Sequence, residues 1–448
     1  MTIISRRDFG RLTAGAATIS AAATAGSTFA IAQAAPKVVV VGGGAGGATV
    51  AHYLVRDRKP ADAKLDVTLI EANPVYSSSF FSNLYIGGFR TLESLNHGYD
   101  GLRKLGIKIV HDTVTDVDPS KRTVRTRGGR TLAYDKLVLS PGIDIKYDTV
   151  PGYSAQLAAQ FPHAYTTAAA GKLQLKRVLD AMPAGGTFAM VMPAGAFRCP
   201  PGPYERACMI AHYLKTKKPQ SKLVILDPKK AFSKQPVFTE AFERYYKDIV
   251  EMNLSTDIDD YSVTAFDAKA RELTTKAGKK VKFAAANIIP GQRAGEVAAK
   301  AGVTKGDWVA VEPESFAAKE QKDIYVVGDA SIADPMPKSA FSANSQAKVV
   351  AADILAVLSK GERFPARFRN TCWSLVAPND CVKIGANYVP KGGKLEASEG
   401  FVSQRDEPAT LRQQNFEESL GWYSNIASDM FAKAAAPPAK APAKKGTG

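Results

Sequence analysis

A glycine-rich turn between an apolar strand and a helix is the clearest chemical signal in the chain. Residues 38–50 have the sequence VVVVGGGAGGATV, which gives Gly42, Gly44 and Gly47 the spacing of a pyrophosphate-binding turn. The glycines allow a tight turn and a close approach of backbone N–H groups to phosphate oxygens, and the helix N-terminus adds partial positive charge. The next apolar stretch, DVTLIEAN, ends in Glu71, whose carboxylate can accept hydrogen bonds from a ribose. This pattern predicts a dinucleotide site.

Four cysteines are the other candidates for chemistry. Cys199 lies in FRCPPGPYERA and Cys372 in NTCWSLVAP. By residue type alone, these two could form a structural bridge, remain buried thiols or do redox chemistry. Cys208, expected on a helix, and Cys381, expected in a loop, could pair with each other or remain free. Four cysteines allow three connectivities, so the spacing does not choose among them.

Alternating strands and helices must position these groups. The first unit is expected to have strands at 37–41, 65–70 and 136–142 and a helix at 45–56. This alternation is typical of a doubly wound α/β fold.

A second unit repeats the alternation of strand and helix, with strands inside 185–195 and 222–228 and a helix at 204–215. Its turn, PAGAFRCPPGPY, lacks the glycine spacing. Prolines there remove backbone donors that a phosphate would need, namely Pro193, Pro200, Pro201 and Pro203. The second unit is therefore predicted to be a poor nicotinamide nucleotide site.

Downstream of both units, residues 323–354 predict a buried strand, then Gly328-Asp329, a proline-bearing loop and a helix from about Ser342. Residues 363–431 are expected to form a less regular segment. The Pro/Ala/Lys-rich tail is expected to be disordered.

The first 35 residues resemble a twin-arginine export signal. Arg6 and Arg7 precede an alanine-rich stretch that ends in small residues suited to cleavage near Ala32 or Ala34. The alternative is an uncleaved membrane anchor. Export of this kind predicts a periplasmic protein, folded around its cofactor beforehand.

The net charge of the chain is +16, of which the leader and the tail supply part. The basic excess suits an acidic protein partner, an anionic substrate or simple solubility. No nucleic-acid motif and no metal site is predicted, nor a stable membrane insertion of the mature chain.

The glycine turn, YDKLVLSPG and YVVGDA together resemble the two-dinucleotide-binding-domain flavoproteins of the glutathione reductase type. In that family the turn binds the FAD pyrophosphate, the middle motif lines the passage between domains, and the aspartate of the third motif binds ribityl or phosphate oxygens. The resemblance gives the last two roles to Pro141, Gly142 and Asp329.

A narrower resemblance, over about residues 37–431, is to the flavoprotein subunit of flavocytochrome c sulfide dehydrogenase. It rests on FSNLYIGG, LESLNHGYDGLR, FRCPPGPYERA, DPMPKSAFSANSQ and NTCWSLVAP. It implies a redox disulfide between Cys199 and Cys372 beside the flavin, with Glu205 as candidate acid or base. Hydrosulfide would attack the disulfide, and the released thiolate would pass two electrons to the flavin. Cys372 is the preferred flavin-proximal cysteine.

Family members attach FAD through a cysteine that precedes the LSN segment, whereas VYSSSFFSN places Ser79 there. A hydroxyl is a poor substitute for a thiolate, so noncovalent FAD with a lowered potential is predicted. Lys338 and the helix near Ser342 are expected at the pyrimidine end of the flavin. The predicted cofactor-binding residues are Gly42, Gly44, Ala45, Gly47, Glu71, Ser79, Asn83, Pro141, Gly142, Gly328, Asp329, Lys338 and Ser342.

The predicted architecture is α/β, with two Rossmann-like dinucleotide-binding domains and a C-terminal α+β interface domain. The expected divisions are a signal peptide at 1–35, an FAD domain at 36–150 and 283–362, a second Rossmann-like domain at 151–282, a C-terminal domain at 363–431 and a tail at 432–448.

The predicted function is periplasmic sulfide dehydrogenation. Because the chain has no CxxCH motif, the haem is expected on a separate c-type cytochrome. One alternative is a sulfide:quinone oxidoreductase, for which residues 420–433 offer the one candidate membrane-binding segment. Another is an accessory flavoprotein that resets the thiols of a partner. An NADH-dependent disulfide reductase is the least expected.

Overall fold

The computed structural model describes residues 34–59, 64–166, 168–256 and 260–433. All but the last two residues of the predicted export leader lie outside these ranges, as does the predicted tail beyond residue 433. None of the helices in the described ranges is long and apolar enough to cross a membrane.

The glycine turn leaves the central strand of a five-stranded parallel sheet. The strand order is β21 (Ile324–Val326), β9 (Lys136–Leu139), β1 (Lys37–Val41), β2 (Asp66–Ile70) and β5 (Lys108–Val110). The valines of β1 are buried, as expected for a parallel strand covered on both faces. The predicted strand 37–41 and helix 45–56 are confirmed at both ends, and β9 ends before the turn at Pro141.

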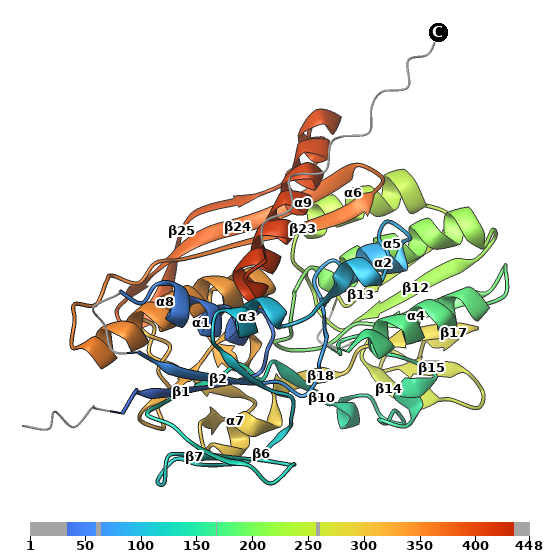
Figure 1. The fold of residues 1–448 in the computed structure, drawn as a ribbon. Coiled ribbons are helices and arrows are strands. Elements are labelled where there is room, and N and C mark those ends of the chain that lie inside the picture. The colour runs from blue at the N-terminus through green and yellow to red at the C-terminus, as the bar shows by residue number, and fades with distance from the viewer. Residues whose placement is uncertain (1–33, 60–63, 167, 257–259, 434–448) are drawn as a thin grey trace, which may run out of the picture. The chain divides into compact units, whose positions relative to one another are not determined.

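Two helices far apart in sequence pack on one face of this sheet. Helix α1 (Ala45–Arg56) contacts α8 (Ala340–Ser359), and both are seen together above β1 and β2 in Figure 1. Helix α8 begins at Ala340, slightly earlier than predicted, because the Ser339 side chain accepts a hydrogen bond from the backbone N–H of Ser342 and caps the helix.

A second parallel sheet has the order β13 (Val250–Leu254), β12 (Lys222–Asp227), β11 (Thr187–Val191) and β17 (Ala285–Ile288). Its helices are α4 (Ala169–Ala181), α5 (Gly202–Lys217) and α6 (Gln235–Tyr246). The predicted helix 204–215 is confirmed as part of α5. Strand β17 pairs with β11, so this sheet includes residues beyond the predicted boundary at 282.

The segment expected to be less regular forms an antiparallel sheet and a long helix. The strands are β23 (Phe368–Ala377), β24 (Asp380–Lys391) and β25 (Lys394–Val402), and the helix is α9 (Ala409–Phe431). The predicted α+β character of this segment is confirmed, but its expected irregularity was wrong. Polar residues in β23 are buried and interrupt the apolar pattern, namely Asn370, Thr371 and Ser374. Cys381 lies in β24 rather than in a loop.

Short elements complete the described chain: β3 (Tyr76–Ser77), α2 (Ser82–Ile86), β4 (Asn96–His97), α3 (Asp100–Lys104), β6 (Val114–Asp118), β7 (Thr123–Thr126), β8 (Thr131–Ala133), β10 (Ile143–Lys146), β14 (Val263–Asp267), β15 (Glu272–Thr275), β16 (Lys280–Lys282), β18 (Gly291–Ala294), α7 (Glu296–Lys300), β19 (Thr304–Lys305), β20 (Trp308–Ala310) and β22 (Ser331–Ile332), with 3-10 turns at Glu93–Leu95, Tyr147–Thr149, Leu157–Ala159 and Gly328–Ala330.

Candidate functional site

Two cavities share a wall at Cys199. The first encloses about 1050 Å³ of empty space including its open mouth, and it runs from the glycine turn past Asp329 to Ser79 and Cys199. The second encloses about 630 Å³ and is lined by Cys199, Cys372 and Glu205. Its remaining walls are mainly apolar and aromatic, with Phe80, Phe81, Leu84, Phe341, Trp373, Phe416 and Trp422.

The glycine turn has two positions that no side chain can occupy and one that is open. A Cβ on Gly42, which has φ of 97°, would overlap the carbonyl oxygen of Ser140, and a Cβ on Gly47 would overlap that of Gly42. A Cβ on Gly44 would meet no atom nearer than Tyr76 Cε2 at 3.7 Å. Gly44 lines the first cavity, so its open side is where a phosphate can approach the backbone.

Glu71 lies at the same end of the cavity. Its Oε2 accepts a hydrogen bond from the backbone N–H of Gly43 at 2.7 Å, and its Oε1 accepts from the backbone N–H of Asn73 at 2.9 Å. The carboxylate is therefore fixed beside the turn and in the cavity wall, together with Ala45.

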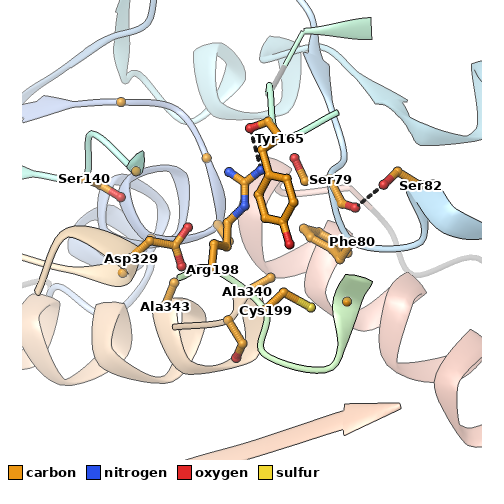
Figure 2. Close-up of a pocket in the computed structure, with 18 of the residues that line it drawn as sticks. Ser79, Phe80, Ser82, Ser140, Tyr165, Arg198, Cys199, Asp329, Ala340 and Ala343 are labelled. Carbon is orange, nitrogen blue, oxygen red and sulfur yellow. Dashed lines mark hydrogen bonds between the residues drawn. The ribbon is translucent and has the colours of Figure 1, made fainter. Parts of the chain in front are cut away.

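The middle of the first cavity carries Asp329 and an arginine that the sequence analysis did not single out. Figure 2 shows the Arg198 side chain between Asp329 and Tyr165. Arg198 Nη2 donates to the Tyr165 carbonyl oxygen at 2.6 Å, and its backbone N–H donates to Gln292 Oε1 at 2.8 Å. Desolvation raises the pKa of Asp329, and Arg198 opposes this shift. The sequence offered one indication of its role, because Arg198 directly precedes Cys199 in the FRCPP motif.

Pro141, Gly142, Gly328 and Ser79 also line the first cavity. The Ser79 hydroxyl lies 3.5 Å from the Thr166 carbonyl oxygen, at the limit of a hydrogen bond.

Lys338 and Ser342 are not in the wall of either cavity. The Lys338 ammonium instead donates to the Ser331 carbonyl oxygen at 2.7 Å and lies 3.8 Å from the centre of the Trp308 ring. The Ser342 hydroxyl is turned toward Asn370. The start of α8 does reach the first cavity, through Ser339, Ala340 and Ala343.

Asn370 orients the Cys372 thiol. The hydroxyls of Ser339 and Ser342 both donate to Asn370 Oδ1, at 2.6 and 3.2 Å. Asn370 Nδ2 lies 3.4 Å from Cys372 Sγ as a donor, and the Cys372 thiol donates to Asn370 Oδ1 at 3.6 Å. Burial raises the pKa of the Cys372 thiol, and the Asn370 contact opposes the shift. The amide is therefore placed to stabilise negative charge on this sulfur.

Glu205 is held in the second cavity rather than at its helix end. Its Oε2 accepts from Asn83 Nδ2 at 2.7 Å, and its Oε1 accepts from the backbone N–H of Leu375 at 2.9 Å. Burial raises the pKa of Glu205. Asn83, predicted as a cofactor contact, lines both cavities and also accepts from Arg206 Nε at 3.1 Å, so it positions Glu205.

The two cysteines line the two cavities differently. Cys199 lines both cavities, whereas Cys372 lines only the second. Cys199 faces the dinucleotide cavity, so the lining favours it, rather than the predicted Cys372, as the flavin-proximal cysteine. Cys199 has φ of 60°, and burial raises the pKa of its thiol to about 12. All four cysteines are thiols in the structure, and the disulfide stays a prediction.

Four cations around the two cavities form no ion pair with a carboxylate of the described residues, namely Lys172, Arg198, Arg206 and Lys234. The Arg206 guanidinium is bound by neutral oxygens, including the carbonyl oxygens of His163 and Ala164. Burial lowers the pKa of Lys172 to about 7. These residues give the site a positive character that the sequence analysis missed, because no spacing in the chain indicates it.

The first cavity fits FAD. The open face of Gly44 suits the pyrophosphate, Glu71 lies where a ribose can be bound, and the cavity continues to Cys199, where a flavin ring can meet a sulfur.

Two family models match the chain. Residues 172–290 match the central part of the sulfide dehydrogenase (flavocytochrome c) flavoprotein chain, and residues 365–431 match the flavin-binding part of flavocytochrome c sulphide dehydrogenase.

Curated relatives match over about a quarter of the chain. The mitochondrial sulfide:quinone oxidoreductase of Dictyostelium discoideum is 34% identical over 122 residues, which are 27% of this chain and 26% of that protein. The sulfide-quinone reductase of Aquifex aeolicus is 34% identical over 110 residues, which are 24% of each protein. The chain therefore spans about a quarter of the length of these relatives.

Solved structures share the fold. The sulfide:quinone oxidoreductase of Aquifex aeolicus has a TM-score of 0.63 at 18% identity and covers 89% of this chain and 93% of its own. NDH2 of Plasmodium falciparum has a TM-score of 0.63 at 11% identity and covers 89% and 96%. These likenesses show that the chain shares its overall fold with both proteins.

Proposed function

Because the chain belongs to the family of flavocytochrome c sulfide dehydrogenase flavoprotein chains, we propose that it oxidises sulfide through Cys199, Cys372 and FAD. One observation carries the proposal: both cysteines and Glu205 line one cavity, and Cys199 also lines the cavity that fits FAD.

The proposed reaction begins with the two cysteines joined as a disulfide. Hydrosulfide attacks the sulfur of Cys372, a new S–S bond forms there, and the bond to Cys199 breaks. The electron pair leaves on Cys199 as a thiolate, so sulfide sulfur is oxidised and the disulfide is reduced. Glu205 takes the proton of the resulting persulfide, and its raised pKa suits that exchange.

Asn370 and Arg198 support the charges that this reaction creates. The Asn370 amide faces Cys372, and Arg198 faces the cavity beside Cys199. FAD, when bound, supplies the acceptor for the electron pair and can release single electrons to a haem. With Ser79 at the position of the family's linking cysteine, we infer that FAD is held noncovalently.

The acceptor that the proposal favours is a c-type cytochrome on a separate chain, met in the periplasm after twin-arginine export. The family descriptions, which name flavocytochrome c, support this choice.

A quinone is the second candidate acceptor, favoured by the aromatic walls of the second cavity and by the names of the curated relatives. The segment 420–433, the candidate membrane-binding surface, gives no further support to a quinone acceptor. Its apolar side chains are mostly buried as part of α9, including Tyr423, Ile426, Met430 and Phe431.

The acceptor test compares the two directly. Purified FAD-loaded protein is mixed with sulfide without oxygen, and the reduction of a soluble c-type cytochrome or a short-chain ubiquinone is followed by absorbance. We expect cytochrome reduction that is faster than ubiquinone reduction. Reduction of ubiquinone alone would establish the second candidate. Failure with both acceptors, together with reduction of a partner protein's disulfide, would point to an accessory role.

A further inference from the structure

A buried lysine far from the cysteines in sequence contacts the backbone of Cys372. Lys234 directly precedes α6 and is 4% exposed. Its ammonium donates to the Cys372 carbonyl oxygen at 3.1 Å, to Ser374 Oγ at 2.8 Å and to the Val382 carbonyl oxygen at 3.3 Å. Since an ammonium has three donors, all of them are engaged by neutral oxygens of β23 and β24.

No carboxylate of the described residues forms an ion pair with this ammonium. Arg412, another buried cation, does have ionic partners, since it contacts Glu240 and Asp380 at 3.0 Å each. A buried charge without an ionic partner is costly, so its retention beside the cysteines requires a reason.

The ionisable groups around Lys234 lie on three elements and on the turn that precedes one of them. They are Glu205 on α5, Cys372 on β23 and Cys381 on β24, with Cys199 in the turn before α5. Burial lowers the pKa of Lys234, and Cys372 is the strongest of the groups that oppose this shift. Conversely, Lys234 opposes the burial that raises the pKa of Cys372. The lysine and the sulfur therefore favour each other's charged form.

We propose that Lys234 is a positioning residue of the cysteine pair, whose fixed ammonium is the counter-charge for anionic sulfur on Cys372. This inference rests on the proposed sulfide oxidation. In the disulfide form Cys372 carries no charge. After hydrosulfide attack, Cys372 carries a persulfide whose proton passes to Glu205, and the persulfide anion then faces Lys234. Arg198 lies beside Cys199, where the electron pair leaves.

The test measures the charge on Cys372 without using sulfide. FAD-loaded protein is reduced with dithiothreitol, freed of the reductant without oxygen and alkylated with iodoacetamide over a pH series. Mass spectrometry of the Cys372 peptide gives the rate at which Cys372 is alkylated. Only the thiolate reacts, so the midpoint of the profile reports its ionisation.

Lys234→Met is the principal variant, and Lys234→Gln, which keeps N–H donors without charge, replaces it if the first is not recovered folded. Removal of a neighbouring positive charge raises the pKa of a thiol by about one unit or more. We therefore expect the midpoint to rise, with alkylation at neutral pH slowed roughly tenfold or more.

Lys172→Met is the matched control. Lys172 is 3% exposed and donates to the carbonyl oxygens of Ser77 and Ala168, but the charges nearest to it are Arg198 and Arg206. We expect this variant to keep the wild-type Cys372 profile.

A wild-type profile in either folded Lys234 variant would overturn the inference, as would an equal shift in Lys172→Met. These outcomes are independent of the proposed function. If sulfide bleaches the wild-type flavin while the Lys234 variants keep the profile, only the lysine inference fails. If the profile shifts while sulfide leaves the flavin oxidised, only the sulfide activity fails.

Discussion

Alanine substitutions in the glycine turn separate cofactor binding from folding. A Cβ on Gly47 or Gly42 would overlap a backbone carbonyl oxygen, whereas Gly44 has φ of −80° and open space on its Cβ side. We therefore expect Gly44→Ala to fold normally and to place a methyl group where a phosphate approaches. Gly47→Ala is the matched variant, with the same added methyl group directed into the fold.

The expected loss follows from the hydrogen bonds at this turn. A hydrogen bond to a charged group contributes about 1.5–3 kcal/mol, and 1.4 kcal/mol corresponds to a tenfold change in affinity. If the methyl group displaces the phosphate from one backbone N–H, FAD binds about 10 to 150 times more weakly.

The assay titrates deflavinated protein with FAD by flavin fluorescence and measures thermal unfolding of the FAD-free forms. We expect Gly44→Ala to bind FAD weakly with an unchanged unfolding temperature. Gly47→Ala should unfold at a lower temperature, since overpacking costs about 1–3 kcal/mol or more. Wild-type affinity in Gly44→Ala, or equal thermal losses in the two variants, would refute the reasoning.

Three further predictions concern the Glu205 carboxylate, the buried His163 and the noncovalent binding of FAD. Glu205→Gln should slow sulfide-driven flavin bleaching by about 100-fold or more without changing FAD content, as rapid-mixing absorbance would show; a wild-type rate would exclude the acid–base role. Burial lowers the pKa of His163 to about 4, so the unfolded chain binds an extra proton between about pH 6.5 and 4, and stability must fall as pH falls through that window. Thermal unfolding should show this fall in wild type and less of it in His163→Gln, and equal slopes would contradict it. Acid precipitation should release the flavin into the supernatant; a yellow pellet would show a covalent link through another residue than Ser79.

Local signals explain what the sequence could predict. The apolar strand β1, the glycine turn and α1 are adjacent in the chain, and each turn glycine has a steric or ligand-facing reason that residue type alone indicates. The two parallel sheets follow from the same alternation of strand and helix, because parallel pairing requires crossover connections.

The missed features depend on contacts between distant segments. Asn370 contacts the Cys372 sulfur through its amide group, and Ser339 and Ser342 from the start of α8 bind the oxygen of the same amide. Lys234 binds the backbone carbonyl of Cys372 and the Ser374 hydroxyl across the interface between α6 and β23, and its neighbours in sequence give no sign of these contacts. The buried polar residues of this site also explain why β23 was not predicted as a strand. They interrupt the apolar periodicity that identifies strands.

The central claim is that sulfide reaches the flavin through the Cys199–Cys372 pair. Anaerobic titration of the oxidised, FAD-loaded protein with sulfide tests it most directly, with the flavin absorbance recorded for wild type, Cys199→Ser and Cys372→Ser. The account predicts that sulfide bleaches the wild-type flavin and that each serine variant remains oxidised over the same time. Bleaching of both variants at the wild-type rate would contradict it.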